Sequence, residues 1–127
     1  MYINMLNRIK NSILAGKNRL KVPFAKFDYE VAQALVKAGY LESAEKKGRS
    51  IKKIIDINIK LDDNGNPKVS DIKLISKPSH KAYKGYSDLR RSKHGYGDYF
   101  MTTSKGIMTT IEARKAKVGG ELLFEIW

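Results

Sequence analysis

Residues 102–127 read TTSKGIMTTIEARKAKVGGELLFEIW, and the signals in this stretch decide how the C-terminal part of the chain folds. Its first five residues combine three hydroxyl side chains with one lysine and one glycine, a composition that favours a turn over a helix or strand interior. Hydroxyl groups both donate and accept hydrogen bonds, and Gly106 allows a partner to approach the backbone closely. The sequence therefore predicts a polar loop at 102–106 that is suited to binding a shallow polar surface.

A short helix and a strand are predicted after this loop. Either Thr109 or Thr110, followed by Glu112, has the pattern of a helix N-cap. The helix is expected to end before the glycine pair at 119–120, and residues 121–127 favour a strand. Regular structure is therefore expected to hold the loop at both of its ends.

Composition limits the number of domains and the kind of partner. A chain of 127 residues forms one compact body or two very small ones that must support each other, because a piece of about 60 residues buries only about 60% of its unfolded surface. Lys and Arg number 25 against 13 Asp and Glu, which gives a formal net charge of +12 and a pI near 9.9. This excess predicts a polyanionic partner, with a soluble protein that is merely cationic as the alternative.

Other partners and locations are disfavoured by what the sequence lacks. No long uncharged apolar stretch is present, so no membrane partner is expected. The absence of cysteine excludes disulfides and thiolate sites, and it fits a reducing compartment. The N-terminus lacks the pattern of a secretory signal, so the protein is expected to stay inside its compartment.

The N-terminal half is predicted to contain two helices. Apolar residues recur at helical spacing from Ile3 to Ile13 and again over 24–38. Gly16 and Gly39 stand where these helices are expected to stop.

Strands are predicted between and after these helices. Basic and apolar residues alternate over 19–22, and residues 40–44 and 51–61 have the pattern of antiparallel strands with one buried face and one wet face. A tight turn then leads into a further strand around 69–75. This half is therefore expected to be α-β-α-β-β, with both helices on one side of a small sheet.

Cations in this half are candidates for contact with phosphate. The segment 46–53 carries five Lys and Arg residues, and it forms either a phosphate-contacting hairpin or a solvated turn. Lys26, at the start of the second helix, is a better contact candidate than Phe24 and Phe27, which are expected in the core.

The C-terminal half is predicted to be rich in strands. A Ser-Lys-Pro-Ser break divides the chain into domains 1–76 and 77–127. Residues 81–91 are basic with tyrosines interleaved, and Tyr83 is either part of an RNA-binding surface or a partly buried ring. A strand at 98–101 then leads into the loop.

Together these residues closely resemble the signature of the bacterial-type S-eight family of small-subunit ribosomal proteins. In the C-terminal part the matching positions are Thr102–Gly106, Thr109, Glu112–Arg114 and Gly119–Glu121. Upstream, the segments that fall in the family's order are Met5–Asn11, Val22–Pro23 with Lys26, Gly39–Tyr40 and Ile75–Pro78. The resemblance covers essentially the whole chain.

The resemblance implies an architecture and a function. The fold is expected to be α+β, with an N-terminal α-β-α-β-β subdomain and a C-terminal subdomain of mostly antiparallel strands and a short helix. The protein is expected to be a structural constituent of the small ribosomal subunit, in the cytoplasm or in an organelle. It would bind the central domain of the ribosomal RNA beside neighbouring ribosomal proteins. The alternatives are a repressor that binds its own messenger RNA and a stand-alone RNA chaperone.

The RNA-binding site is expected to centre on the hydroxyl loop. Its hydroxyls would bond 2′-hydroxyls and base edges, its lysine would neutralise phosphate, and its glycine would permit close approach. The expected RNA-binding residues are Thr102, Thr103, Ser104, Lys105, Gly106, Glu121, Lys26, Lys77 and Tyr83. Several positions differ from the family: Ala25 stands where a helix-capping serine is usual, and Thr102 replaces a serine. The segment 89–94 is more charged than in the family, and Asp98 and Tyr99 depart from its usual aliphatic residues.

No enzymatic activity, cofactor or metal is expected. His80 and His94 are the only histidines, and neither has the spacing of a nucleophilic, acid-base or metal-binding site. The carboxylates are few and dispersed, and no phosphate-binding glycine loop is present.

Overall fold

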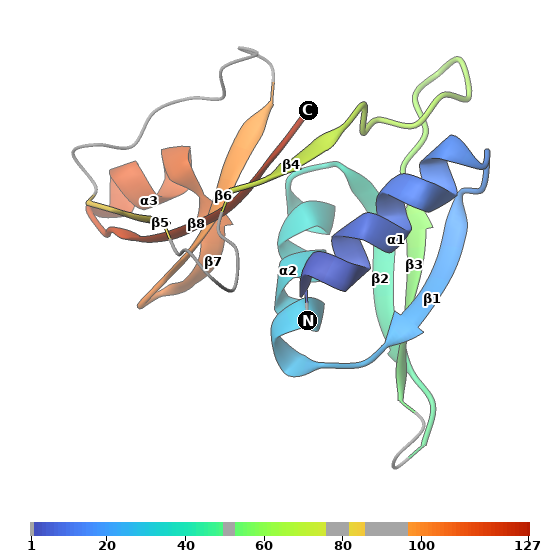
Figure 1. Ribbon diagram of the computed structural model, residues 1–127, viewed down its shortest axis with the longest axis horizontal. Coiled ribbons are helices and arrows are strands. Elements are labelled where there is room, and N and C mark those ends of the chain that lie inside the picture. The colour runs from blue at the N-terminus through green and yellow to red at the C-terminus, as the bar shows by residue number, and fades with distance from the viewer. Residues whose placement is uncertain (1, 50–52, 76–81, 86–96) are drawn as a thin grey trace. The chain divides into compact units, whose positions relative to one another are not determined.

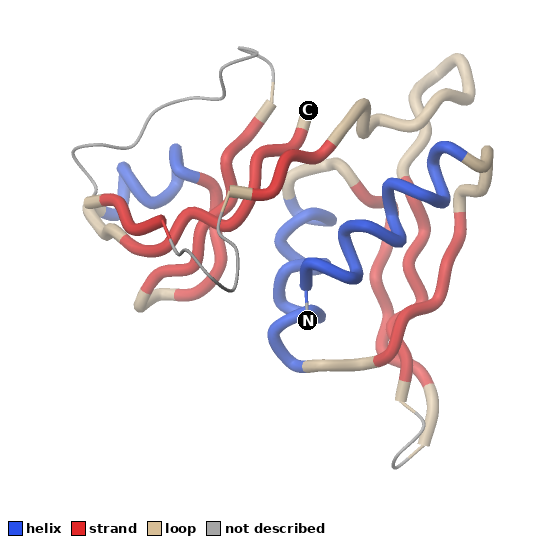
Figure 2. The backbone as a smooth tube through the Cα atoms, viewed as in Figure 1, coloured by secondary structure: helices blue, strands red, loops and turns tan. Residues whose placement is uncertain are grey.

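A computed structural model describes the chain over residues 2–49, 53–75, 82–85 and 97–127 (Figure 1). In chain order the elements are α1 (Tyr2–Leu14), β1 (Arg19–Pro23), α2 (Lys26–Lys37), β2 (Leu41–Lys47), β3 (Ile54–Ile59), β4 (Ile72–Leu74), β5 (Ala82–Lys84), β6 (Asp98–Thr103), β7 (Gly106–Thr109), α3 (Thr110–Ala116) and β8 (Gly120–Ile126). Helices and antiparallel strands occur in both parts of the chain (Figure 2). The expected α+β class is confirmed.

Strand β4 does not pair within the half of the chain in which the sequence placed it. Contacts group the residues into an N-terminal unit, 1–69, and a C-terminal unit, 70–127. The sequence placed the strand around 69–75 in the N-terminal half, but β4 pairs with β8 of the C-terminal unit. Strand pairing, which the sequence pattern does not show, therefore assigns β4 to the C-terminal unit. Residues 76–79, where the sequence predicted the boundary, lie outside the described part of the chain.

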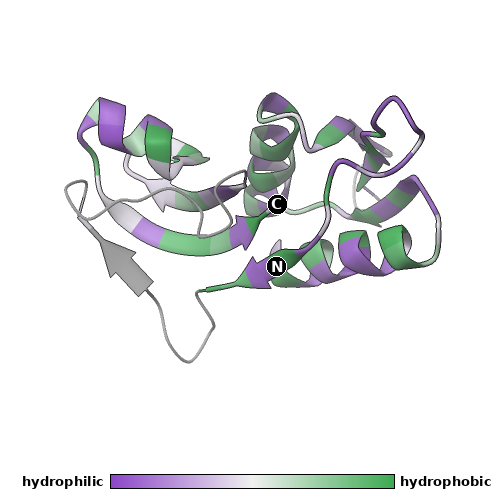
Figure 3. Ribbon diagram, turned by 90° about the horizontal axis from the view of Figure 1, so that it is seen from above, coloured by the Kyte–Doolittle hydropathy of each residue, from purple (hydrophilic) through white to green (hydrophobic). Residues whose placement is uncertain are grey.

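In the N-terminal unit, α1 and α2 pack on one face of a sheet with the strand order β1-β3-β2. Hydrophilic and hydrophobic bands alternate along both helices (Figure 3), as expected for helices with one apolar face. The buried face of α1 is rotated relative to the apolar face that the sequence predicted. Tyr2 and Met5 are buried, whereas Ile3 and Ile13 are only partly buried. Other core residues of this unit are Leu6, Ile9, Val22, Val31, Leu35, Leu41, Ile55 and Ile57.

The other face of this sheet differs from the prediction at one position. Strand β3 is central, and its residues Ile55, Ile57 and Ile59 are buried beneath the helices. The alternate face was predicted to be wet, yet Asp56 is only 2% exposed. The prediction is wrong there because cationic side chains from both neighbouring strands cover this carboxylate.

The two ends of α2 are formed differently. At the C-terminal end, Gly39 has φ 90° and donates its N–H to the Val36 carbonyl, and Tyr40 donates to the Leu35 carbonyl. This is a Schellman motif, and it confirms the predicted stop. At the N-terminal end, Ala25 makes no side-chain capping bond, as expected where the serine is missing.

The two phenylalanines that were expected in the core lie at its edge. Phe27 is 37% exposed and packs edge-on against Tyr2, with 5.5 Å between ring centroids. Phe24 is half-buried, and the Lys46 Nζ lies 4.7 Å from the centroid of its ring. The expectation is wrong for Phe27 because its neighbour Asp28 is the residue that α2 buries at this position.

The C-terminal unit is a sheet of five strands covered in part by α3. The strand order is β4-β8-β6-β7, and β5 also pairs with β8. Phe100 and Phe124 are opposite each other in register and stack with ring centroids 5.2 Å apart. Met101 of β6 and Ala113 of α3 are fully buried, and Met108, Val118 and Leu122 pack against them. The predicted short helix and last strand are both confirmed.

Candidate nucleic-acid interface

Strands β6 and β7 form a hairpin whose tip is the hydroxyl loop. Thr103 lies opposite Gly106 in register, so Ser104 and Lys105 are the two residues at the tip. Both are exposed and neither has a positive φ, whereas Gly106 has φ 111°. A type I turn followed by a glycine with positive φ has this pattern. The predicted turn is confirmed at Ser104 and Lys105, and it requires glycine at position 106 for its backbone conformation. The predicted loop is wrong at its ends, because strand pairing places Thr102 and Thr103 in β6 and Gly106 in β7.

The Thr103 side chain stabilises the loop from within. Its hydroxyl donates to the Gly106 carbonyl oxygen at 2.8 Å and accepts from the Lys105 N–H at 3.1 Å. The donor of this hydroxyl is therefore already in use. Contact between Thr103 and RNA stays a prediction, whereas its role in shaping the loop was not predicted from the sequence.

Pairing of the strands brings three of the expected site residues into one row. Thr102 on β6 lies opposite Glu121 on β8, and Glu121 lies opposite Tyr83 on β5. Side chains at directly opposite positions of antiparallel strands project from the same face, so those of Glu121 and Thr102 share a face next to the loop. The Tyr83 backbone occupies the next position of the row. The structure thus assembles these residues from three separate segments.

Gly120 fixes the distance between β8 and β6 beside this row. Gly120 lies opposite Thr103, and a Cβ atom on it would lie 2.0 Å from the Thr102 carbonyl oxygen and 3.2 Å from the Thr103 Cα. Only a hydrogen fits there. The sequence singled out this glycine as the end of a helix, and its second role depends on strand pairing that the sequence does not reveal.

The far end of β7 is held by the N-cap of α3. Thr109, rather than Thr110, is the capping residue, and its hydroxyl oxygen accepts from the Glu112 N–H at 3.3 Å. Structure on both sides of the loop is therefore confirmed.

The remaining expected site residues are not all placed. Lys26 is the first residue of α2, is exposed, and belongs to the N-terminal unit. Lys77 and the histidines at 80 and 94 lie outside the described residues.

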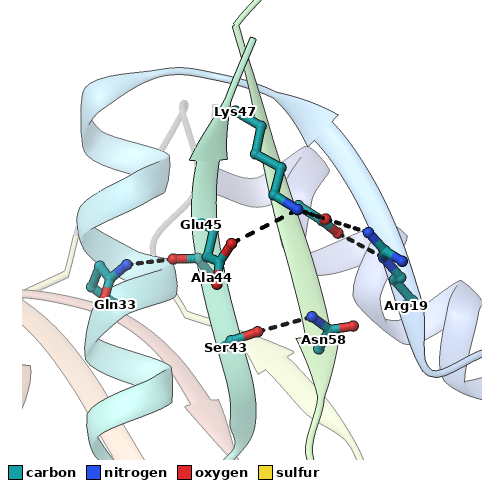
Figure 4. A network of polar contacts seen from close by, with 8 residues as sticks. Arg19, Gln33, Ser43, Ala44, Glu45, Lys47 and Asn58 are labelled. Atoms are coloured by element: carbon teal, nitrogen blue, oxygen red, sulfur yellow. Dashed lines mark hydrogen bonds and ion pairs between the residues drawn. The ribbon is translucent and has the colours of Figure 1, made fainter.

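A polar network lies on the outer face of the N-terminal sheet (Figure 4). The Arg19 Nε and one terminal nitrogen donate to the two oxygens of Asp56, at 3.0 and 2.6 Å. The Lys47 Nζ donates to the same carboxylate at 2.9 Å and lies 3.8 Å from Glu45. Hydrogen bonds from the Arg19 guanidinium, and then from Lys47, hold the pKa of the Asp56 carboxyl well below its usual range.

This network was missed at the level of sequence. It becomes recognisable once the register is known, because Lys21 on β1 and Glu45 on β2 are the residues directly opposite Asp56. Arg19 and Lys47 are two positions further along those strands, within reach of long side chains. A charged residue in the middle of a central strand, with basic residues on both neighbours, was the available signal.

Within the described residues, no three His, Cys, Asp or Glu side chains are grouped closely enough to hold a metal ion. Over the same part of the chain, none of the helices combines the length and the hydropathy that crossing a bilayer requires.

A small basic α+β chain that presents an exposed polar loop on an antiparallel sheet has the features of a compact nucleic-acid-binding protein. The family model described as Ribosomal protein S8 matches residues 2–127, and the chain belongs to this family.

Individual relatives agree with this assignment. The small ribosomal subunit protein uS8 of Nautilia profundicola is 38% identical over 122 residues, which cover 96% of this chain and 93% of the relative. The protein of the same name from Persephonella marina is 38% identical over 129 residues, with 98% and 95% covered. That of Rippkaea orientalis is 38% identical over 125 residues, with 98% and 94% covered. The family is structural and non-enzymatic, which confirms the expectation that the chain is not an enzyme.

Proposed function

We propose that this protein binds the central domain of small-subunit ribosomal RNA directly, beside neighbouring ribosomal proteins, and supports assembly of the subunit in the cytoplasm. The relatives' names describe proteins of the small ribosomal subunit. A net charge of +12 favours a polyanionic partner. The observation that carries the proposal is the exposed Ser104–Lys105 tip on a hairpin whose backbone is fixed on both sides.

The tip residues supply the chemistry that an RNA surface needs. The minor groove of an RNA helix displays 2′-hydroxyls and base edges, and irregular helices expose more of them. The Ser104 hydroxyl is small enough to reach such groups and both donates and accepts. Lys105 neutralises a nearby phosphate, and Gly106 lets the RNA approach the backbone.

The neighbouring row extends this contact. Thr102 and Glu121 project from one face beside the loop, with Tyr83 at the next position of the row. Glu121 accepts a hydrogen bond from an exocyclic amine or a 2′-hydroxyl, and Thr102 adds a second hydroxyl. Thr103 contributes chiefly by shaping the loop, because its own donor is used by the Gly106 carbonyl.

Ser104→Ala tests the proposal. The variant is expected to lose about 1 kcal/mol or more of binding free energy for a transcribed central-domain RNA, and little for a random duplex, because one positioned hydrogen bond is removed. Ser70→Ala is the matched control, since Ser70 is another exposed serine of the same unit. Affinity is measured for both RNAs at fixed salt.

Two outcomes would refute the assignment. If Ser104→Ala weakens binding to both RNAs equally, the loop does not recognise the central-domain site specifically. If the unaltered protein binds central-domain and scrambled RNA equally well, a stand-alone RNA chaperone describes the protein better.

A further inference from the structure

Helix α3 ends in the same backbone motif as α2, but with a different kind of residue at its turning point. The Lys117 N–H donates to the Arg114 carbonyl at 3.2 Å, and the Val118 N–H donates to the Ala113 carbonyl at 3.0 Å. Val118 also packs against the buried cluster that contains Ala113. These features define a Schellman motif, in which Lys117 takes the left-handed position that Gly39 takes after α2.

A lysine at this position has a cost in stability. Lys117 has φ 57° and ψ 43°, and among residues 2–49, 53–75, 82–85 and 97–127 it is the only residue other than glycine with a positive φ. A side chain in this conformation brings its Cβ atom close to a backbone carbonyl oxygen, a strain that glycine avoids. The backbone alone would therefore favour glycine at position 117.

The helix dipole gives little reason for a further cation at this place. Positive side chains near a helix C-terminus interact favourably with the dipole, but Arg114 and Lys115 already stand in the last turn of α3. Lys117 itself is exposed, and no carboxylate in the described part of the chain forms an ion pair with it. Its ammonium is thus available to an external anion.

Lys117 also lies close to the expected RNA-binding residues. Gly120, three residues later, is opposite Thr103 of the hairpin, and Glu121 is opposite Thr102. Three residues of chain span at most about 11 Å, and the flexible stem of a lysine extends that reach. An anion bound along this row is therefore accessible to the Lys117 ammonium.

We propose that Lys117 contacts a phosphate of the RNA that the hydroxyl loop binds, and that this contact accounts for a lysine where glycine would make the fold more stable. The identification of the anion as RNA rests on the proposed function. An RNA helix is contacted through 2′-hydroxyls and phosphates together, so an RNA docked against Ser104 and Glu121 presents backbone phosphates beside them. Lys117 thus lowers the stability of the fold and raises affinity for RNA.

Two substitutions at position 117 separate the charge from the backbone conformation. Lys117→Gln removes the charge and keeps the strained Cβ atom, whereas Lys117→Gly removes both. Lys115 is the matched control, because it is an exposed lysine of the same helix. It lies two residues after the buried Ala113, and this step turns it about 200° around the helix, away from the sheet.

Binding to transcribed central-domain RNA is measured from about 50 to about 200 mM salt, and stability by thermal unfolding. Both variants at position 117 are expected to flatten the plot of log affinity against log salt by roughly 0.7 to 0.9 units, the value of one phosphate contact. Across that range of salt, the unaltered protein then loses about 2.6 to 3.5 times more affinity than either variant. Lys115→Gln should leave the slope unchanged.

Lys117→Gly is also expected to raise the melting temperature by about 2 to 4 °C. Removal of the strain outweighs the greater freedom of glycine in the unfolded chain. Lys115→Gly is expected to lower the melting temperature instead, because it places a glycine within regular helix.

An unchanged slope in either variant at position 117, or an equal change in Lys115→Gln, overturns the proposal. A melting temperature that does not rise in Lys117→Gly also overturns it, because the lysine then stabilises the helix end itself. Ser104→Ala on the same RNA keeps the two proposals apart. If it weakens binding while the Lys117 variants leave the slope unchanged, only the phosphate contact of Lys117 is refuted. If no variant alters RNA binding, the proposed function fails as well.

Discussion

The outer face of the N-terminal sheet and the tip of the β6–β7 hairpin are both polar, but they use their polar groups in opposite ways. On the sheet, Arg19 and Lys47 turn toward a buried Asp56, so the donors and acceptors satisfy one another. At the hairpin, Ser104 and Lys105 project outward from a backbone that other residues hold in place. Density of polar residues therefore does not identify a binding surface. The proposed RNA contact rests instead on exposed polar groups that have a fixed support, as at this hairpin tip.

Gly120→Ala is expected to have the largest effect on stability, because it displaces the strand that supports the hairpin tip. A Cβ atom 2.0 Å from the Thr102 carbonyl oxygen forces β8 away from β6, at a cost of about 3 kcal/mol or more. Stability is measured by denaturant unfolding, and binding to central-domain RNA should fall with it. Gly85→Ala is the control, since nothing lies within 4 Å of a Cβ there. Equal stability of the two variants would contradict the role given to Gly120.

Asp56→Asn is expected to have the next largest effect on stability, and to act only on the polar network around Asp56. Asparagine keeps the shape but lacks the charge, so the melting temperature should fall by several degrees at pH 7, more than for the exposed Asp63→Asn. Discrimination between RNAs by the hydroxyl loop should not change.

The pH dependence of stability gives a second readout for Asp56. The pKa of its carboxyl is lower in the folded protein than in the unfolded chain, so its stabilising contribution is present at neutral pH. That contribution is lost as the pH falls below about 4, where the unfolded chain begins to bind the proton. Asp56→Asn should therefore reduce the loss of stability with acid. A variant with the same acid profile as the unaltered protein would show that the network contributes little.

Thr103→Val is expected to produce a smaller effect that is confined to the loop. The hydroxyl bonds to Gly106 and Lys105 are lost, at a cost of about 1 kcal/mol, while the shape of the side chain is kept. Hydrogen exchange at the Lys105 amide should become faster, and affinity for central-domain RNA should fall with no change in salt slope. Ser104→Ala should leave this amide unaffected. Unchanged exchange in Thr103→Val would mean that the backbone alone holds the loop.

The sequence predicted regular structure better than it predicted pairing. Helix patterns, the turn at Ser104 and Lys105 and the last strand depend on local spacing, and all of them are present. The partner of β4 and the burial of Asp56 depend on which strands lie side by side, and a single sequence carries little information about that. Within the site, the loop was predicted from its composition, whereas the steric role of Gly120 and the inward bonds of Thr103 became visible only with β6, β7 and β8 in register.

The starts of two helices repeat the comparison on a smaller scale, because α3 has a side-chain cap on its first turn and α2 has none. Thr109 caps α3, whereas Ala25 before α2 has an extended backbone, with φ −142° and ψ 144°, and no capping oxygen. Since this backbone already suits a capping residue, Ala25→Ser should stabilise the protein by about 0.5 to 1 kcal/mol, and Thr109→Ala should destabilise it by about 1 kcal/mol. Thermal unfolding of both variants measures these changes. If Ala25→Ser gives no gain in stability, water hydrogen-bonds the first N–H groups of α2 as well as a serine would. The missing side-chain cap at Ala25 then does not destabilise the fold.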